Sequence, residues 1–124
     1  MPASYKIDKQ HSLVTSIESG VLSNIDCKNH QRQLAADPNF NPIFSQLIDL
    51  TQVTKLALTA EDVRQLAQAK IFSDCSRRAL LASSDELFGM SRMFGILRDT
   101  MGETGVRVFR SREEAMLWVG GSKK

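Results

Sequence analysis

The sequence is poor in the residues that build disulfide-rich, metal-binding or membrane-spanning proteins. Its 124 residues include two cysteines, two histidines and three prolines. It holds no run of 18 apolar residues that would cross a bilayer and no charged-then-apolar signal segment. A disulfide scaffold and an integral membrane protein are therefore not expected. The cytoplasm is the expected location, and in that reducing compartment a Cys27–Cys75 disulfide is disfavoured.

The few possible metal ligands are spread widely along the chain. Cys27 and His30 lie one helical turn apart, and His11 could add a third ligand across the fold. A tetrahedral zinc site takes four ligands with short, recognisable spacings, which this chain does not offer. No metal and no cofactor are predicted. A glycine-rich phosphate loop, a nucleophile elbow and a dinucleotide fingerprint are also missing, so we assign no catalytic residue and expect no enzyme.

Clusters of one charge sign are also missing. Sixteen basic and fourteen acidic side chains leave a net charge of +2. The adjacent basic pairs are Arg77–Arg78 and Lys123–Lys124, and both are expected on solvated edges. Nucleic-acid binding requires a clustered basic face, so nucleic acid is not an expected partner.

What the chain does contain is typical of one folded domain. Hydrophobic residues make up 42% and charged residues 24% of the sequence, and the length is in the commonest range for a single domain. No repeat, linker or low-complexity segment divides it. We therefore interpret residues 1–124 as a single domain.

Hydrophobic periodicity predicts strands that alternate with helices. The first two strands read as an antiparallel pair around a turn at 10–12, and Gly20 is expected to end the second. Ser23, Thr59, Ser84 or Asp85, and Ser111 are the expected helix caps. The expected strands are 5–9, 13–19, 46–51, 77–83 and 106–110, and the expected helices are 24–36, 60–72, 85–101 and 112–119.

This order, β-β-α-β-α-β-α-β-α, predicts an α/β domain whose later strands are parallel, because successive strand–helix–strand units cross over in one hand. We expect a five-stranded, mostly parallel, mixed sheet with four helices. The loop 37–44, with two prolines, is expected to be held on the core by Phe40, Ile43 and Phe44.

Several segments together resemble a known family. They are "DPNFNP", the strand "LIDLT" with Asp49, "MSRMFG" and the closing "VFRSREEAMLWV". The chain resembles the SpoIIAA-like proteins, small bacterial domains related to the STAS anti-sigma-factor antagonists. The resemblance implies a fold shared with CRAL-TRIO lipid-transfer domains. It also implies a bacterial protein that is cytoplasmic or peripheral at the membrane, often homodimeric, without established enzymatic activity.

In the STAS antagonists the central strand leads to an Asp-Ser-Ser-Gly turn whose serine is phosphorylated. Here the matching turn reads Ala57-Leu58-Thr59-Ala60, so the signature is absent. Thr59 is the one hydroxyl left at that turn, and a helix cap explains it fully, so we expect a cap in preference to a phosphosite. Asp49 lies in an apolar strand and needs a partner, for which we expect a hydrogen bond to the following loop.

The third predicted helix is the most informative segment. Leu87, Met90, Met93, Phe94, Leu97 and Met101 fall on one stripe, whereas Phe88 and Ile96 project outside it. Methionine-rich surface suits an adaptable partner or ligand, and Arg92 and Arg98 could meet a carboxylate, a phosphate or an acidic partner. Core packing, a dimer face and an acyl-chain pocket remain open. The candidate ligand or partner surface is Phe88, Met90, Arg92, Met93, Phe94, Ile96 and Leu97.

Two functions follow as expectations. The first is a non-enzymatic regulatory or interaction module, acting as a homodimer or docking to another protein, without the phosphoserine switch. The alternative is a carrier or sensor of a hydrophobic ligand, such as a lipid or acyl chain, with a possible place at the membrane surface.

Overall fold

The strands of the computed structural model, which describes residues 3–121, form one mixed sheet in chain order. The antiparallel edge pair is followed by three parallel neighbours, as predicted. The strands are β1 (Ala3–Asp8), β2 (Leu13–Ser23), β3 (Ser45–Ala57), β4 (Arg78–Leu81) and β5 (Val106–Phe109).

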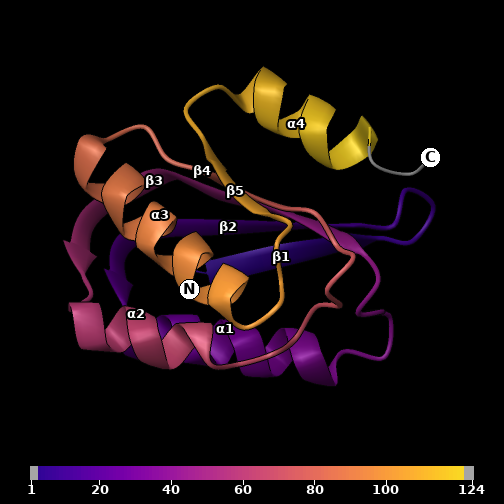
Figure 1. The fold of residues 1–124 in the computed structure, drawn as a ribbon, viewed down its shortest axis with the longest axis horizontal. Coiled ribbons are helices and arrows are strands. Elements are labelled where there is room, and N and C mark those ends of the chain that lie inside the picture. The colour runs from indigo at the N-terminus through magenta and orange to yellow at the C-terminus, as the bar shows by residue number, and fades with distance from the viewer. Residues whose placement is uncertain (1–2, 122–124) are drawn as a thin grey trace.

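Helices cover both faces of this sheet. They are α1 (Asn24–Ala36), α2 (Ala60–Ala67), α3 (Asp85–Thr100) and α4 (Arg112–Gly121). The first three lie on one face, called here the helix-rich face, and α4 lies alone on the opposite face (Figure 1). None of the helices in the described part of the chain is long and apolar enough to span a bilayer.

The first three helices begin directly after their predicted cap residues. The hydroxyls of Ser23 and Ser84 accept from the backbone amides of Asp26 and Leu87. Thr59 forms a full capping box with Asp62, whose carboxylate accepts from the Thr59 amide at 2.9 Å. The first backbone amides of a helix have no carbonyl partner within the helix, and the cap hydroxyls accept their hydrogen bonds instead. These caps therefore fix the residues at which the helices begin.

Replacing Thr59 with Ala is expected to lower the free energy of unfolding by about 1 kcal/mol, because the Asp62 amide loses its acceptor. Urea unfolding measures this difference. Thr104→Ala, at an exposed loop position, serves as the control and should stay within about 0.5 kcal/mol of the parent. An equal loss in both variants would remove the cap as the explanation.

Two local expectations were wrong. Gly20 does not end β2: the strand continues to Ser23, and Gly20, at φ +67, sits at a register shift in the pairing with β3. Such an irregularity bends a strand without ending it. In the 37–44 loop, Phe40 and Phe44 pack edge to face with a centroid separation of 6.4 Å, but Ile43 is 64% exposed.

The expected apolar stripe of α3 is confirmed in part: Leu87 and Phe94 are buried, and Met90, Met93 and Leu97 pack partly buried against the same core. The helix buries a row of residues spaced four, three and four apart, namely Leu87, Ser91, Phe94 and Arg98. Arg98, for which we expected a carboxylate, a phosphate or an acidic partner, is buried in an ion pair with Glu103 of the same chain. Met101, just after the end of the helix, is 47% exposed.

Candidate functional site

Three polar side chains lie side by side on the helix-rich face of the sheet, on neighbouring strands. Ser16 of β2 accepts a hydrogen bond from the Gln46 side chain of β3 at 3.0 Å. Gln46 in turn accepts from Arg78 Nε of β4 at 3.0 Å, and these two residues are directly paired across the strands. The side chains point the same way because alternate residues of a strand share one face.

The row continues into the helices at both ends. On the α1 side, His30 Nε2 lies 2.9 Å from Ser16 Oγ. On the other side, Glu103 accepts from Arg78 Nη1 at 3.1 Å and from Arg98 Nε at 2.8 Å. We call the six residues His30, Ser16, Gln46, Arg78, Glu103 and Arg98 the polar row. It separates two apolar clusters of the helix-rich face, one around Phe44 and Phe72 and one around Leu50 and Leu66.

Arg78 is the centre of this row and was misplaced by the sequence analysis. It was expected on a solvated edge, yet it is 5% exposed. Its guanidinium lies over the rings of Phe72, at 4.5 Å, and Phe94, at 5.6 Å. Burial lowers the pKa of Arg78 and Glu103 opposes that shift. Two arginines and one carboxylate leave the row with a net positive charge.

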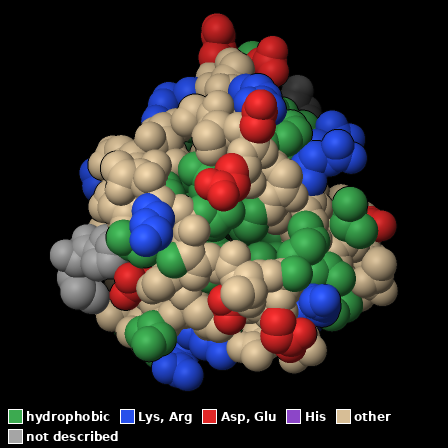
Figure 2. Space-filling model, turned by 90° about the vertical axis from the view of Figure 1, so that its left-hand side faces the viewer, with side chains coloured by type: hydrophobic (Ala, Val, Ile, Leu, Met, Phe, Trp, Pro, Cys, Tyr) green, Lys and Arg blue, Asp and Glu red, His purple; other side chains and the backbone are tan. Residues whose placement is uncertain are grey.

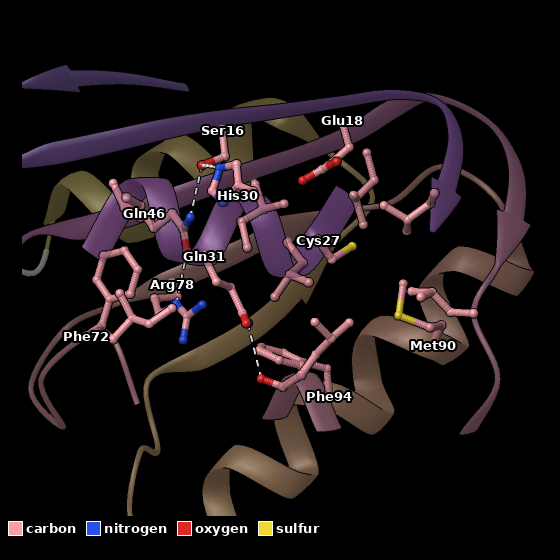
Figure 3. Close-up of a pocket in the computed structure, with 18 residues that line it drawn as sticks. Ser16, Glu18, Cys27, His30, Gln31, Gln46, Phe72, Arg78, Met90 and Phe94 are labelled. Atoms are coloured by element: carbon pink, nitrogen blue, oxygen red, sulfur yellow. Dashed lines mark hydrogen bonds between the residues drawn. The ribbon is translucent and has the colours of Figure 1, made fainter. Parts of the chain in front are cut away.

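A cavity of about 90 Å³ lies beside the polar row, between the sheet and the first three helices (Figure 3). Its wall is mostly aliphatic and aromatic: Leu22, Leu34, Ile48, Leu50, Leu58, Leu66, Ile71, Phe72, Leu80, Met90 and Phe94. Ile48, near the start of the central strand, is only half-buried because its side chain faces the cavity. The cavity is partly open to solvent.

Glu18 supplies the cavity's acidic group. It lies on β2 two residues beyond Ser16, so both side chains face the helices, and its carboxylate points into the cavity in Figure 3. The residue is 6% exposed. Burial, with the charge of Asp26 as a second cause, raises the pKa of Glu18 to about 7.

Two further titratable residues of the wall stay uncharged near neutral pH. Burial raises the pKa of the Cys27 thiol to about 12, with Glu18 adding to the shift. Burial also lowers the pKa of His30 to about 4, with the charge of Arg78 adding to the shift. The thiol is therefore a poor nucleophile and His30 is a neutral hydrogen-bonding group.

The cavity lies next to the ends of β2 and β3. Hydrophobic side chains gather in the middle of the surface on that side of the molecule, with charged side chains around them (Figure 2). From there the cavity extends beneath the helices to Gln46 and Arg78, at the amino-terminal ends of β3 and β4.

The residues of the candidate ligand or partner surface lie in different places in the structure. Met90 and Phe94 line the cavity. Arg92, Met93, Ile96 and Leu97 lie together on the outside of α3, where they border a shallow hollow. Phe88 is half-buried beneath the Arg110 guanidinium, 4.3 Å from its ring centre. Thr59 is exposed at the start of α2 and is not among the residues that line the cavity.

Asp49 faces the opposite side of the sheet, away from the cavity. Its carboxylate accepts from the Thr51 amide at 2.9 Å and hydroxyl at 2.6 Å, and it pairs with Arg112 of α4. These hydrogen bonds offset the burial of Asp49 and hold its pKa below the usual value. The expected partner in a following loop is replaced by a residue of the same strand and a helix from the far end of the chain.

No group of three or more His, Cys, Asp or Glu side chains within residues 3–121 is arranged to hold a metal ion. Sequence reasoning missed the polar row and Glu18. The available signal was a polar residue at a core-facing position in each of β2, β3 and β4, namely Ser16, Gln46 and Arg78.

No family model and no curated protein matches the chain. Among solved structures, the chain is similar to an uncharacterized protein from the DUF3478 family with a SpoIIAA-like fold, from Shewanella loihica PV-4. The identity is 19%, the TM-score is 0.60, and the match covers 94% of this chain and 93% of that one. The chain therefore has the SpoIIAA-like fold that the sequence resemblance implied. At this identity the likeness concerns the fold alone.

Proposed function

We propose that the protein is a non-enzymatic module that binds a small, mostly apolar ligand in the cavity beside the polar row. The observation that carries this proposal is the wall itself: eleven apolar side chains surround a space that is open to solvent. Ligand sites combine such apolar walls with a few placed polar groups. Here Glu18, Ser16 and Arg78 are those groups.

The volume limits the ligand. An engineered apolar cavity of about 150 Å³ holds benzene, so about 90 Å³ takes a molecule of roughly four non-hydrogen atoms. A complete fatty acid does not fit inside the cavity in this conformation. Within the hydrophobic-ligand alternative, the geometry therefore favours a short-chain ligand over a lipid.

The wall holds no activated thiol, although Glu18, with a pKa of about 7, lies in the range of a general acid–base group. A nucleophile or general acid–base works best with a pKa matched to its task. The Cys27 thiol and the His30 imidazole are shifted away from neutrality in opposite directions. Both residues line the same cavity, but His30 is too weak a base to deprotonate the Cys27 thiol.

A regulatory interaction module is the second candidate. The observation that favours it is the outer side of α3, where Ile96 is 57% exposed next to the half-buried Met93 and Leu97. Exposed apolar surface of this kind marks protein-binding sites when it is contiguous. Arg92 beside it would give an acidic partner a charged contact.

Native mass spectrometry of protein purified from its own host separates the two candidates. We expect protein that carries a small-molecule adduct, released on mild collisional heating. An empty dimer that Ile96→Asp converts to a monomer would instead support the interaction module. Arg92→Ala is a matched control on the same side of α3, because it removes a charge without placing one on the apolar surface.

A further inference from the structure

Glu18 is a buried carboxylate that the protein itself leaves without a partner. It is 6% exposed, and within residues 3–121 it makes no hydrogen bond or ion pair, although every other carboxylate and guanidinium of the helix-rich interior has one. The Glu18 oxygens keep some accessible surface, but a carboxylate that loses most of its contact with water and gains no partner is unfavourable. The carboxylate points into the cavity (Figure 3), so a molecule in the cavity is placed to compensate it.

The other charges divide the cavity into two ends. Around Glu18 the neighbouring charge is Asp26, which also acts on Cys27. At the opposite end, Arg78 is already bonded to Gln46 and Glu103 and acts on His30. Arg78, the cation of the wall, is therefore already paired with protein groups, and the end of the cavity around Glu18 lacks a positive charge.

We propose that the cavity selects a short aliphatic primary amine, whose ammonium group is received by the Glu18 carboxylate and whose alkyl chain packs against the apolar wall. This inference rests on the proposed function and specifies its ligand class. An ammonium group has three donors and no acceptor, which matches an acceptor-only carboxylate. A ligand carboxylate would instead meet Glu18 and Asp26 with like charge.

The pH dependence follows from the groups that face Glu18. The charge that acts on Glu18 is that of Asp26 on α1, and Asp62 of α2 acts on the neighbouring Cys27. The wall also includes His30 of α1, the uncharged Met90 and Phe94 of α3 and, at the opposite end, Arg78 of β4. With the pKa of His30 near 4 and that of Cys27 near 12, Glu18, at about 7, changes charge in the neutral range. Amine affinity should fall up to about tenfold for each pH unit below that point and level off above it.

The experiment is a titration followed by 13C-methyl NMR, with n-propylamine, n-propanol and sodium propionate as probes. At pH 8 we expect the amine to bind about tenfold more tightly than the alcohol, because hydrogen bonds to charged groups are the stronger ones. Glu18→Gln should remove that advantage, so that the amine binds this variant no more tightly than n-propanol does. Glu86→Gln, at an exposed position of α3, is the matched control and should bind like the parent. Unchanged methyl resonances of Val119, on the opposite face, would show that the variants are folded.

The outcomes separate this inference from the proposed function. Equal affinity for amine and alcohol, or tighter binding of propionate, would overturn the amine assignment and leave the apolar site standing. An amine advantage that survives Glu18→Gln would overturn it as well. If none of the three probes binds saturably, the proposed function itself is contradicted.

Discussion

Glu103→Gln is expected to lower the free energy of unfolding by about 3–5 kcal/mol, because breaking a buried ion pair leaves uncompensated charge. Glu103 is fully buried, and its carboxylate contacts both Arg78 and Arg98. Two buried guanidinium groups would then share a neutral amide. A typical domain is stable by about 5–15 kcal/mol, so a loss of this size removes a large share of the stability.

Urea unfolding of three proteins tests this expectation. The exposed pair of Glu61 with Arg64 gives the control, and Glu61→Gln should change stability by less than about 1 kcal/mol. In the third protein, Arg78, Arg98 and Glu103 are replaced together by Met, Met and Leu. Because no charge is then left without a partner, this variant should recover most of the loss. A loss below about 1 kcal/mol in Glu103→Gln would show that the row does not behave as a charge network.

Gly105→Ala is expected to destabilise the fold by about 3 kcal/mol, at the upper end of overpacking effects. A Cβ at this position would lie 2.2 Å from the backbone carbonyl oxygen of Ser76. Neither backbone can move freely, because the Gly105 carbonyl accepts from the Arg78 amide at 2.7 Å. The substitution therefore forces apart β4 and the entry to β5, next to the buried guanidinium.

Gly89→Ala is expected to have the opposite effect on the stability of the same protein. Gly89 lies in the exposed part of α3, and an added Cβ there would meet no atom within 4 Å. Alanine is the better helix former by about 1 kcal/mol, so this variant should be more stable than the parent. Thermal unfolding of the two variants tests whether Gly105→Ala lowers the stability and Gly89→Ala raises it. A Gly105→Ala protein as stable as Gly89→Ala would contradict the close approach of β5 to the loop before β4.

The sequence predicted the architecture because its local signals agree with one another. The capping box at Thr59, the hydroxyl at Ser84 and the left-handed Gly102 mark helix ends through contacts within a few residues. The alternation of apolar and polar residues in β1 and β2 predicted that these two strands form the antiparallel pair. Such signals need no knowledge of the tertiary fold, which explains why the order of elements was right.

The site required information that local patterns do not carry. Ser16, Gln46 and Arg78 come together only once β2, β3 and β4 are aligned, and the register is a property of the sheet. Arg98 looked like a surface residue until Glu103, in a loop, gave it a buried partner. A charge in an apolar segment was therefore interpreted as solvent-facing, whereas pairing across the fold buried it.

The central claim, that the helix-rich face contains a ligand site, is tested most directly by the 13C-methyl spectrum during titration with n-propanol. We expect saturable shifts at Ile48, Leu50 and Met90 around the cavity, with Val119 on the opposite face unaffected. Ile48→Phe should fill the cavity and abolish the shifts. Shifts of equal size on both faces, or saturable binding that persists in Ile48→Phe, would contradict the account.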